Sequence, residues 1–254
     1  MLYIHIPFCV YKCAYCNFYS VVNMNSPDSY KKYLDALIKE FEIRIKDYKK
    51  NIETIYIGGG TPSIIGAKML EYFFEKLFEV INKNNNDKIK EITIEFNIND
   101  INKDSLKVIS QIKNIRLSIG IQTFNEESLK IINRKTDKND IIEALKLINK
   151  SNIENISVDF ICGLPLNDKE QSKKDILQAF DLLPKIKHIS LYYLELNDSL
   201  KNKWRDFLPT EEDCVYYYNL AKETIESFGL MRYEISNYAF SNYESIHNSG
   251  YWDL

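Results

Sequence analysis

Short runs of apolar residues alternate along this chain with longer segments in which apolar residues recur every three or four positions. The short runs predict β-strands, and the longer segments predict amphipathic helices. Six short runs fall within the first 195 residues, and each is followed by a helical segment. This alternation is typical of βα units around a parallel sheet. The strands are predicted at residues 2–6, 54–57, 91–96, 115–119, 156–161 and 187–194.

The first predicted helix begins after Ser26, which stands before Pro27 and Asp28 and is a suitable N-cap. Its apolar positions continue as far as Ile45. The last apolar run of the chain, Met231–Ile235, is predicted to be either a seventh strand or an edge. The other helices are predicted at residues 67–81, 103–112, 126–132, 139–150, 173–183 and 211–228.

The number of βα units limits which folds are possible. Six βα units in about 200 residues are too few for a closed eight-fold barrel, which takes about 250 residues. The pattern predicts an α/β fold with an open (βα)6 partial barrel of the TIM type, and periodicity alone leaves a doubly wound open sheet as the alternative. We expect a core at residues 1–195 and a short C-terminal extension at residues 196–254.

Composition and charge narrow the class of protein. Hydrophobic residues make up 45% of the 254 residues and charged residues 27%, which excludes a mainly disordered chain. The net charge of −3 gives no basic field for nucleic acid, so no nucleic-acid partner is predicted. No run approaches the ~20 apolar residues of a membrane span, and the N-terminus does not resemble a signal peptide. With five cysteines in no pairing pattern, the sequence predicts a cytoplasmic location.

Three of these cysteines, Cys9, Cys13 and Cys16, lie in the loop after the first strand. Three thiols cannot pair off as disulfides, and the short arcs between them suit convergence on one metal centre. Iron–sulfur clusters are held by cysteine thiolates, usually four of them. A set of three leaves one iron open to a small molecule, so the spacing favours a [4Fe–4S] cluster with an open iron.

A structural zinc site is the alternative, with His5 or a distant thiol as the fourth ligand. Zinc motifs usually bring two pairs of cysteine or histidine residues, and no second pair follows here. Cys162 and Cys214 stand alone and far apart in the sequence. The spacing therefore favours the cluster over zinc.

Each predicted strand is followed by residues that could bind a ligand. In parallel α/β folds, ligands bind beyond the carboxyl ends of the strands. The first strand leads to the cysteines, and the second leads to a glycine loop whose backbone can approach a ligand closely. The third strand ends at Glu95, the fourth runs to Gln122, and the fifth contains Asp159. We expect these residues to meet at one rim of the barrel.

The segment Leu2–Cys16, with its Cys-x3-Cys-x-Tyr-Cys spacing, resembles the radical S-adenosylmethionine (SAM) superfamily. It is similar to the HemN/HemW branch, which holds oxygen-independent coproporphyrinogen III oxidases and heme chaperones. The resemblance implies that the three cysteines hold a [4Fe–4S] cluster and that SAM chelates the fourth iron. It also implies one-electron reduction of SAM to methionine and a 5′-deoxyadenosyl radical.

Later motifs match the same superfamily. They are Gly58-Gly-Gly-Thr-Pro62, Arg116-Leu-Ser-Ile-Gly-Ile-Gln-Thr-Phe124 with a following Arg134, and Val158-Asp-Phe-Ile-Cys-Gly-Leu-Pro165. The resemblance implies a SAM site among the residues of these motifs and of the first and third strands. The implied contacts are Tyr3, Tyr15, Gly59, Gly60, Thr61, Glu95, Gln122, Arg134 and Asp159.

Features outside the core separate the two branches. The coproporphyrinogen oxidases carry an extra cysteine where this chain has Phe18, and they have an N-terminal arm before the first strand. The C-terminal His247-Asn-Ser-Gly-Tyr251-Trp252 resembles a motif of the heme chaperones, which implies heme contacts from His247, Tyr251 and Trp252. Histidine can ligate heme iron and aromatic rings can stack on the macrocycle. Without the motif, a lone histidine near a tryptophan is more often a packing residue.

The resemblance therefore implies a heme chaperone, with a coproporphyrinogen III oxidase as the alternative and a zinc protein as a remote one. Whether the chain is an enzyme stays open at this point. The implied partners are SAM, heme or another porphyrin, an electron donor such as flavodoxin or ferredoxin, and a respiratory heme protein as acceptor. Members of the family continue into a mostly helical C-terminal domain, so we expect this chain to be C-terminally truncated.

Overall fold

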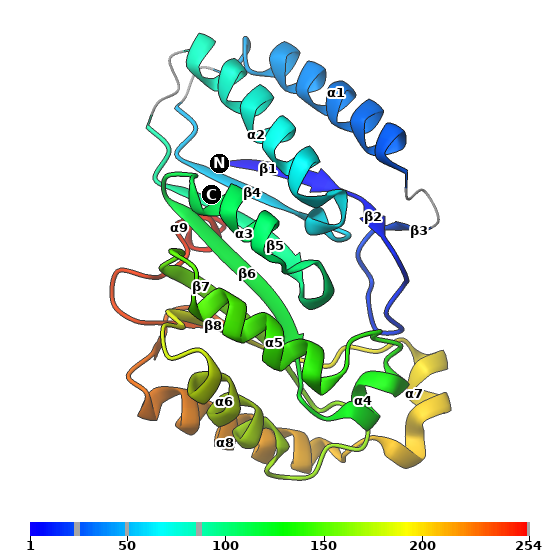
Figure 1. Cartoon of the computed structure of the whole chain (residues 1–254). Coiled ribbons are helices and arrows are strands. Elements are labelled where there is room, and N and C mark those ends of the chain that lie inside the picture. Colours follow the sequence, from blue (N-terminus) through cyan, green and yellow to red (C-terminus); the bar gives the residue numbers. More distant parts are fainter. Residues whose placement is uncertain (23–25, 49–50, 85–87, 253–254) are drawn as a thin grey trace.

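The computed structural model describes residues 1–22, 26–48, 51–84 and 88–252 and contains one curved sheet of eight strands (Figure 1). Six of these strands are parallel and follow the sequence order from one edge of the sheet. They are β1 (Leu2–Ile6), β4 (Thr54–Gly59), β5 (Glu91–Asn97), β6 (Ile115–Gln122), β7 (Asn155–Cys162) and β8 (His188–Tyr193). The prediction of an α/β partial barrel with six parallel strands is confirmed.

Two antiparallel strands continue the sheet beyond β8. β10 (Asn237–Ala239) pairs with β8, and β9 (Met231–Arg232) forms the outer edge. The predicted strand at Met231–Ile235 is therefore an edge of only two residues, and the seventh strand of the sheet is β10, which the sequence did not reveal. Residues 196–254, predicted as an extension, thus contribute strands to the same sheet as the core.

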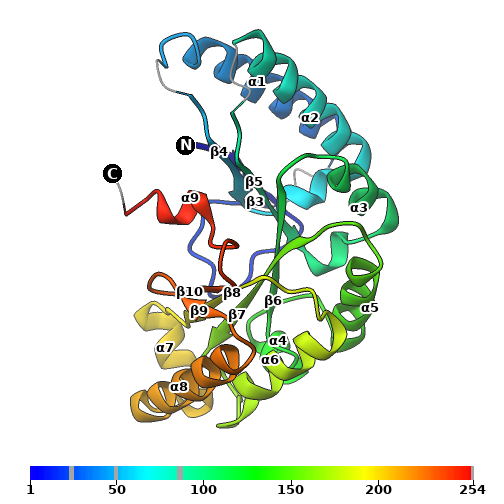
Figure 2. The same ribbon diagram turned by 90° about the vertical axis from the view of Figure 1, so that its left-hand side faces the viewer.

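Helices cover the outer side of the curve (Figure 2). Ser26 caps the first helix as predicted, because its side chain accepts a hydrogen bond from the Ser29 N–H at 3.2 Å. Helix α7, which the sequence analysis missed, is capped in the same way by Asn197. The helices are α1 (Pro27–Arg44), α2 (Gly66–Lys83), α3 (Lys103–Ser110), α4 (Glu126–Ile131), α5 (Lys138–Asn149), α6 (Gln171–Leu182), α7 (Asp198–Trp204), α8 (Glu211–Ser227) and α9 (Ile246–Ser249).

Short 3₁₀ turns and one small ribbon complete the described structure. The turns are Pro62–Ile65, Ile98–Asp100 and Arg205–Phe207, and the ribbon pairs β2 (Phe8–Cys9) with β3 (Val21–Val22) in parallel. In the part of the chain that the structure describes, no helix is both long and apolar enough to cross a membrane.

The two faces of the sheet have different chemistry. Ile92 and Ile94 of β5 are buried under the helices, as are Leu117 and Ile119 of β6, and together with α2 and α5 they form the main core. Because side chains alternate along a strand, the residues between them face the inside of the curve. Those positions hold polar side chains, including Glu91, Thr93, Glu95, Arg116 and Ser118. The fold therefore places a polar chamber on the concave side of the sheet.

Candidate functional site

The cysteine loop begins where β2 ends. Cys9, Cys13 and Cys16 are half-buried free thiols, and Cys13 is close enough to the other two for their charges to act on it. The Cys9 Sγ lies 3.5 Å from the Thr61 Oγ1 of the glycine loop. The loop also turns on itself, since the Cys16 N–H donates to the Cys13 carbonyl at 3.1 Å. The three predicted cluster ligands thus share one loop at the carboxyl ends of the strands.

Residues that follow α4 hold this loop in place. The Ala14 N–H donates to the Ile132 carbonyl at 2.9 Å, and the Asn133 Nδ2 donates to the Lys12 carbonyl at 2.8 Å. These contacts bring the loop next to Arg134 and therefore join two motifs that lie more than a hundred residues apart.

The glycine loop after β4 packs directly on the segment that leads to the cysteines. The Gly60 N–H donates to the Ile6 carbonyl at 2.9 Å, and the Thr61 N–H donates to the Phe8 carbonyl at 2.8 Å. A Cβ atom at Gly60 would lie 2.6 Å from the Phe8 carbonyl oxygen, which is closer than real Cβ atoms come. Only glycine therefore permits this approach.

Arg134 supplies a buried positive charge beside the cysteines. Its guanidinium donates to the Gly120 carbonyl and, at 3.4 Å, to the Asn97 Oδ1, while its Nε has no hydrogen-bond partner. Burial raises the pKa of the Cys13 thiol, and the nearby guanidinium counteracts this effect. Burial also raises the pKa of Tyr15, which Arg134 opposes in the same way. A buried cation with a free donor is suited to bind an anionic group.

Gln122 ends β6 in an irregular conformation. The β6–β7 register shifts between Gly120 and Gln122, and Gln122 has a φ of 73°, which is uncommon for a residue with a side chain. The Gln122 Nε2 lies 2.8 Å from the place that a Cβ at Gly120 would occupy, so the amide folds over that glycine beside Arg134. The bulge therefore aims the amide of Gln122 at the rim.

Two carboxyl groups face the inside of the barrel below the rim. Burial and, to a smaller extent, the charge of Asp159 raise the pKa of Glu95 to about 7. The hydrogen bond from the Tyr56 hydroxyl at 2.7 Å acts in the opposite direction. Burial also raises the pKa of Asp159, whose Oδ2 accepts from the Ser118 Oγ at 3.2 Å and whose Oδ1 has no partner. The pair lies where a cationic group would stabilise both ionised forms.

Tyr3 and His5 line the same chamber from β1. The Tyr3 hydroxyl lies 3.0 Å from the His5 Nδ1, and the His5 Nε2 lies 3.1 Å from the Tyr19 carbonyl oxygen. Both ring nitrogens of His5 are therefore engaged away from the thiols, which gives no support to His5 as a fourth zinc ligand. Among the described residues, no three or more His, Cys, Asp or Glu side chains form a group that could hold a metal ion as they stand.

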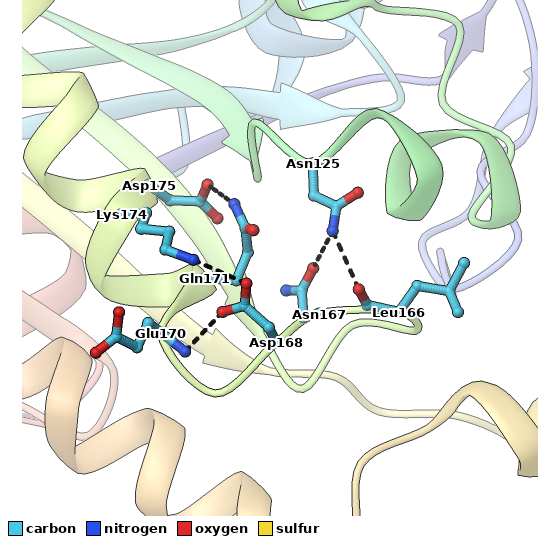
Figure 3. Close-up of polar contacts among 8 residues, drawn as sticks. All are labelled: Asn125, Leu166, Asn167, Asp168, Glu170, Gln171, Lys174 and Asp175. Carbon is cyan, nitrogen blue, oxygen red and sulfur yellow. Dashed lines mark hydrogen bonds and ion pairs between the residues drawn. The ribbon is translucent and has the colours of Figure 1, made fainter.

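A group of polar contacts, which we call the latch, joins the loops that follow β6 and β7; it is formed by Asn125, Leu166, Asn167, Gln171 and Asp175. Figure 3 shows Asn125, which caps α4, donating from its Nδ2 to the Leu166 carbonyl at 3.1 Å and the Asn167 Oδ1 at 3.3 Å. Asp175 of α6 accepts from the Gln171 Nε2 at 2.7 Å and from the Phe124 N–H at 3.0 Å. Burial raises the pKa of Asp175 to about 6. The latch therefore holds the loops after β6 and β7 together at the carboxyl ends of these strands.

The predicted heme residues lie elsewhere. His247 is 1% exposed, with its Nδ1 2.9 Å from the Thr54 Oγ1 at the amino end of β4 and its Nε2 3.3 Å from the Tyr251 hydroxyl. Tyr251 and Trp252, in contrast, are 55% and 60% exposed. The structure therefore brings the cysteines and the SAM-motif residues to one rim but places His247 at the opposite end of a strand.

Tyr56 is a site residue that the sequence analysis missed. It donates to Glu95, and its ring stacks on that of Tyr3 with centroids 6.1 Å apart. The signal was present, because Tyr56 stands two positions before Gly58 and therefore faces the same side of the strand as the glycine loop.

Known proteins match this arrangement. The family described as the radical SAM superfamily matches residues 3–176. The chain is 34% identical to the heme chaperone HemW of Lactococcus lactis, over 99% of this chain and 65% of the relative. It is 37% identical to HemW of Buchnera aphidicola from Schizaphis graminum, over 100% of this chain and 66% of the relative. The chain thus spans about two-thirds of the length of these relatives.

Solved structures show the same fold. Coproporphyrinogen III oxidase (HemN) from Escherichia coli aligns with a TM-score of 0.79 and 23% identity, over 95% of this chain and 55% of that one. SuiB from Streptococcus suis bound to S-adenosylmethionine aligns with a TM-score of 0.58 and 16% identity, over 89% of this chain and 47% of that one.

The chain belongs to the radical SAM superfamily. Membership implies a [4Fe–4S] cluster and SAM as cofactors, and the donor set of this rim fits both. Three free thiols in one loop suit a cluster with an open iron. A buried arginine with an unpaired donor suits a carboxylate, and two buried carboxyl groups suit an amine or sulfonium.

Proposed function

We propose that Cys9, Cys13 and Cys16 ligate the cluster and that the surrounding rim binds SAM. When bound, the cluster supplies an electron for the reductive cleavage of SAM, and the protein contributes orientation and exclusion of water. In this proposal the glycine loop, with Gly59, Gly60 and Thr61, lies against the methionine part of SAM.

In this proposal, different charged residues bind different parts of the SAM molecule. Arg134 binds the SAM carboxylate through its free Nε, with Gln122 beside it as a second polar group. Glu95 and Asp159 hold the cationic part, because an approaching positive charge favours ionisation of two carboxyl groups whose pKa values burial has raised. Tyr3 is proposed to contact the adenosine, and Tyr15 is proposed to pack beside the cluster loop.

We further propose that the protein acts as a heme chaperone, which binds heme and transfers it. The observation that carries this proposal is the similarity to HemW of 34% and 37% along nearly the whole of this chain. Phe18 supports it, since the oxidase branch carries its extra cysteine at that position and Phe18 is 71% exposed beside the cysteine loop. The same exposure gives the loop an apolar surface.

Tyr251 and Trp252 are the proposed heme contacts with exposed rings. Aromatic faces of this kind can stack on a porphyrin. Coordination of heme iron by His247 stays a prediction, and it requires His247 to leave Thr54 or Tyr251, which now engage both ring nitrogens.

Anaerobically reconstituted protein tests the function directly. Titration with heme is expected to give a Soret band at a stoichiometry near one, and this band should weaken in Trp252→Ala and Tyr251→Ala. The same preparation, supplied with SAM and a reductant, should leave coproporphyrinogen III unchanged. Conversion to protoporphyrinogen IX without heme binding would refute the chaperone proposal and identify an oxidase.

We also propose an electron donor, a heme acceptor and a cellular location for the protein. An electron donor such as flavodoxin or ferredoxin is proposed because reduction of the cluster needs a low-potential donor. A respiratory heme protein is proposed as the acceptor of the heme. Five free cysteines support a reducing, cytoplasmic location. We also retain residues 1–195 as the SAM-binding core and residues 196–254 as an extension of its sheet.

A further inference from the structure

The C-terminal part of the described chain, residues 233–251, includes β10 at one end of the sheet and then continues to α9 on the concave side; we call it the strap (Figure 2). The Tyr233 hydroxyl lies 2.9 Å from the His188 Nε2 on β8. The Ser245 Oγ donates to the Glu91 Oε1 on β5 at 2.9 Å. Further along, α9 packs on β4. The strap therefore crosses the polar chamber from one half of the sheet to the other.

His247 of the strap lies directly against Tyr56. The two ring centroids are 5.2 Å apart with a tilt of 40°. The hydrogen bond between His247 and Thr54 fixes the imidazole over the tyrosine, because Thr54 and Tyr56 point to the same side of β4. Tyr251 closes the other side of the imidazole. Tyr56 therefore cannot change its position without disturbing the strap.

Tyr56 in turn sets the position of Glu95. Its hydroxyl donates to the Glu95 Oε1 at 2.7 Å. Both side chains lie against Gly58, where a Cβ would stand 2.9 Å from the Tyr56 Cε1 and 3.0 Å from the Glu95 Oε2. The absence of a side chain at Gly58 thus creates the space that they share, and His247 packs on the ring of Tyr56.

We infer that His247 is a positioning residue for the SAM site. Its ring holds Tyr56 in the place from which the Tyr56 hydroxyl orients the Glu95 carboxylate toward SAM. This inference rests on the proposed SAM site, and it gives the C-terminal histidine a role that does not involve heme iron. It also explains why a histidine remote from the rim has no ring nitrogen available for a metal.

A double-mutant cycle tests the inference. SAM is titrated into reconstituted, reduced protein, and the change in the cluster EPR signal gives the dissociation constant. His247→Ala is expected to weaken SAM binding about threefold to tenfold, since aromatic contacts have energies of this size. Tyr56→Phe, which removes the hydrogen bond to Glu95, should weaken it about tenfold. The double variant should be no weaker than Tyr56→Phe, because both changes act through one hydroxyl.

Tyr233→Phe is the matched control. It removes the strap hydroxyl that contacts the His188 Nε2 and accepts from the Ser245 N–H, and it leaves both Tyr56 and the Ser245 side chain that caps α9 in place. It should lower the thermal midpoint of the ligand-free protein about as much as His247→Ala does, yet leave the SAM dissociation constant unchanged. Equal loss of SAM affinity in both variants would mean that the strap has only a structural role, and the inference would fail.

Two further results separate this inference from the proposals on which it rests. Glu95→Gln with unchanged SAM affinity would overturn the proposed SAM site and the inference together. Glu95→Gln with weak SAM binding, combined with His247→Ala at wild-type affinity, would overturn the inference alone. Loss of the heme Soret band in His247→Ala without any change in SAM binding would return His247 to heme coordination.

Discussion

Two glutamates of β5 face the same side of the sheet but have opposite surroundings. Glu91, at the amino end, is buried and accepts hydrogen bonds from one hydroxyl and two N–H groups of the strap at 2.9–3.1 Å. Glu95, at the carboxyl end, accepts from Tyr56 and Gly59, and burial raises its pKa to about 7. The carboxylate at the amino end is saturated by the chain itself, whereas the one at the rim is left to respond to a ligand.

One strand thus contributes both to the stability of the fold and to ligand binding. Carboxylates with several donors are stabilising because their hydrogen-bonding capacity is satisfied within the fold. A carboxyl group that is buried with few donors costs free energy until a cation reaches it, and such groups mark ligand sites. If this contrast is correct, changes at the rim should remove cofactors, while changes under the strap should remove stability.

The largest effect is expected at the rim cysteines. Substitution of Cys9, Cys13 or Cys16 by alanine should abolish the cluster, because the loop has three thiols and the proposed cluster needs all of them as ligands. Iron and sulfide analysis after anaerobic reconstitution measures the loss. Cys162→Ala is the control and should keep its iron, since Cys162 is fully buried and burial raises its pKa to about 12. A cluster that survives in Cys13→Ala would contradict the assignment.

The next largest effect is expected at Glu91. Glu91→Ala removes the acceptor of three strap hydrogen bonds and should lower the free energy of unfolding by about 3 kcal/mol. Urea unfolding of the ligand-free protein measures this change. Glu95→Gln serves as the comparison and should leave the stability at neutral pH unchanged or raised. Equal destabilisation by the two changes would erase the contrast between the ends of the strand.

The pH dependence of SAM binding is a further test of the contrast between Glu91 and Glu95. The Glu95 carboxyl group has a pKa of about 7, so it is mainly protonated at pH 6 and mainly ionised at pH 8. Each pH unit below the pKa reduces the ionised fraction about tenfold, and SAM affinity should fall in proportion as the pH decreases. Glu95→Gln should show a much flatter profile between these two values. Titrations by EPR or calorimetry provide the measurement, and identical slopes would exclude Glu95 as the titrating group.

The smallest effect is expected at the latch, where Asp175 is buried and its pKa is raised to about 6. Because the folded pKa lies above the unfolded value of 3.8, the folded protein loses stability as the pH rises from about 4 to about 6. The shift of about two pKa units corresponds to at most about 3 kcal/mol. Asp175→Asn removes the buried charge but also one acceptor oxygen, so it should be more stable than the wild type by about 1–2 kcal/mol above pH 6 and no more stable below pH 4. Thermal melts at pH 4 and pH 7 test this, and a variant that is less stable at both values would contradict it.

Much of the fold could be predicted because its determinants are local. The strands of the barrel have buried residues on alternate positions or throughout, and Ser26 caps α1 through its own neighbours. The run Met231–Ile235 was harder, since the chain turns back after Arg232 and only β10 reaches β8. No local pattern distinguishes that turn from a continuing strand.

The candidate site also has parts that could be predicted from the sequence and parts that could not. The cysteines, the glycine loop and Arg134 stand in contiguous motifs, and the structure gathers them at one rim. The backbone of Gln122 could not be predicted, because its positive φ arises from a bulge in the pairing with β7. The environment of His247 also depends on tertiary contacts, since its partner Thr54 is 193 residues away. A motif identified this residue but could not reveal that its ring is buried.

The strap also has a consequence for the order of folding. Ser245 and Glu91 are 154 residues apart, and His188 is 45 residues from its partner Tyr233. Contacts that close such long loops form after local ones. On the ribosome, the residues of β1 to β8 are synthesised before residues 233–251, and a domain generally folds as a unit. The sheet therefore cannot reach its final state, with Glu91 and His188 bonded to the strap, until the C-terminal residues have been made.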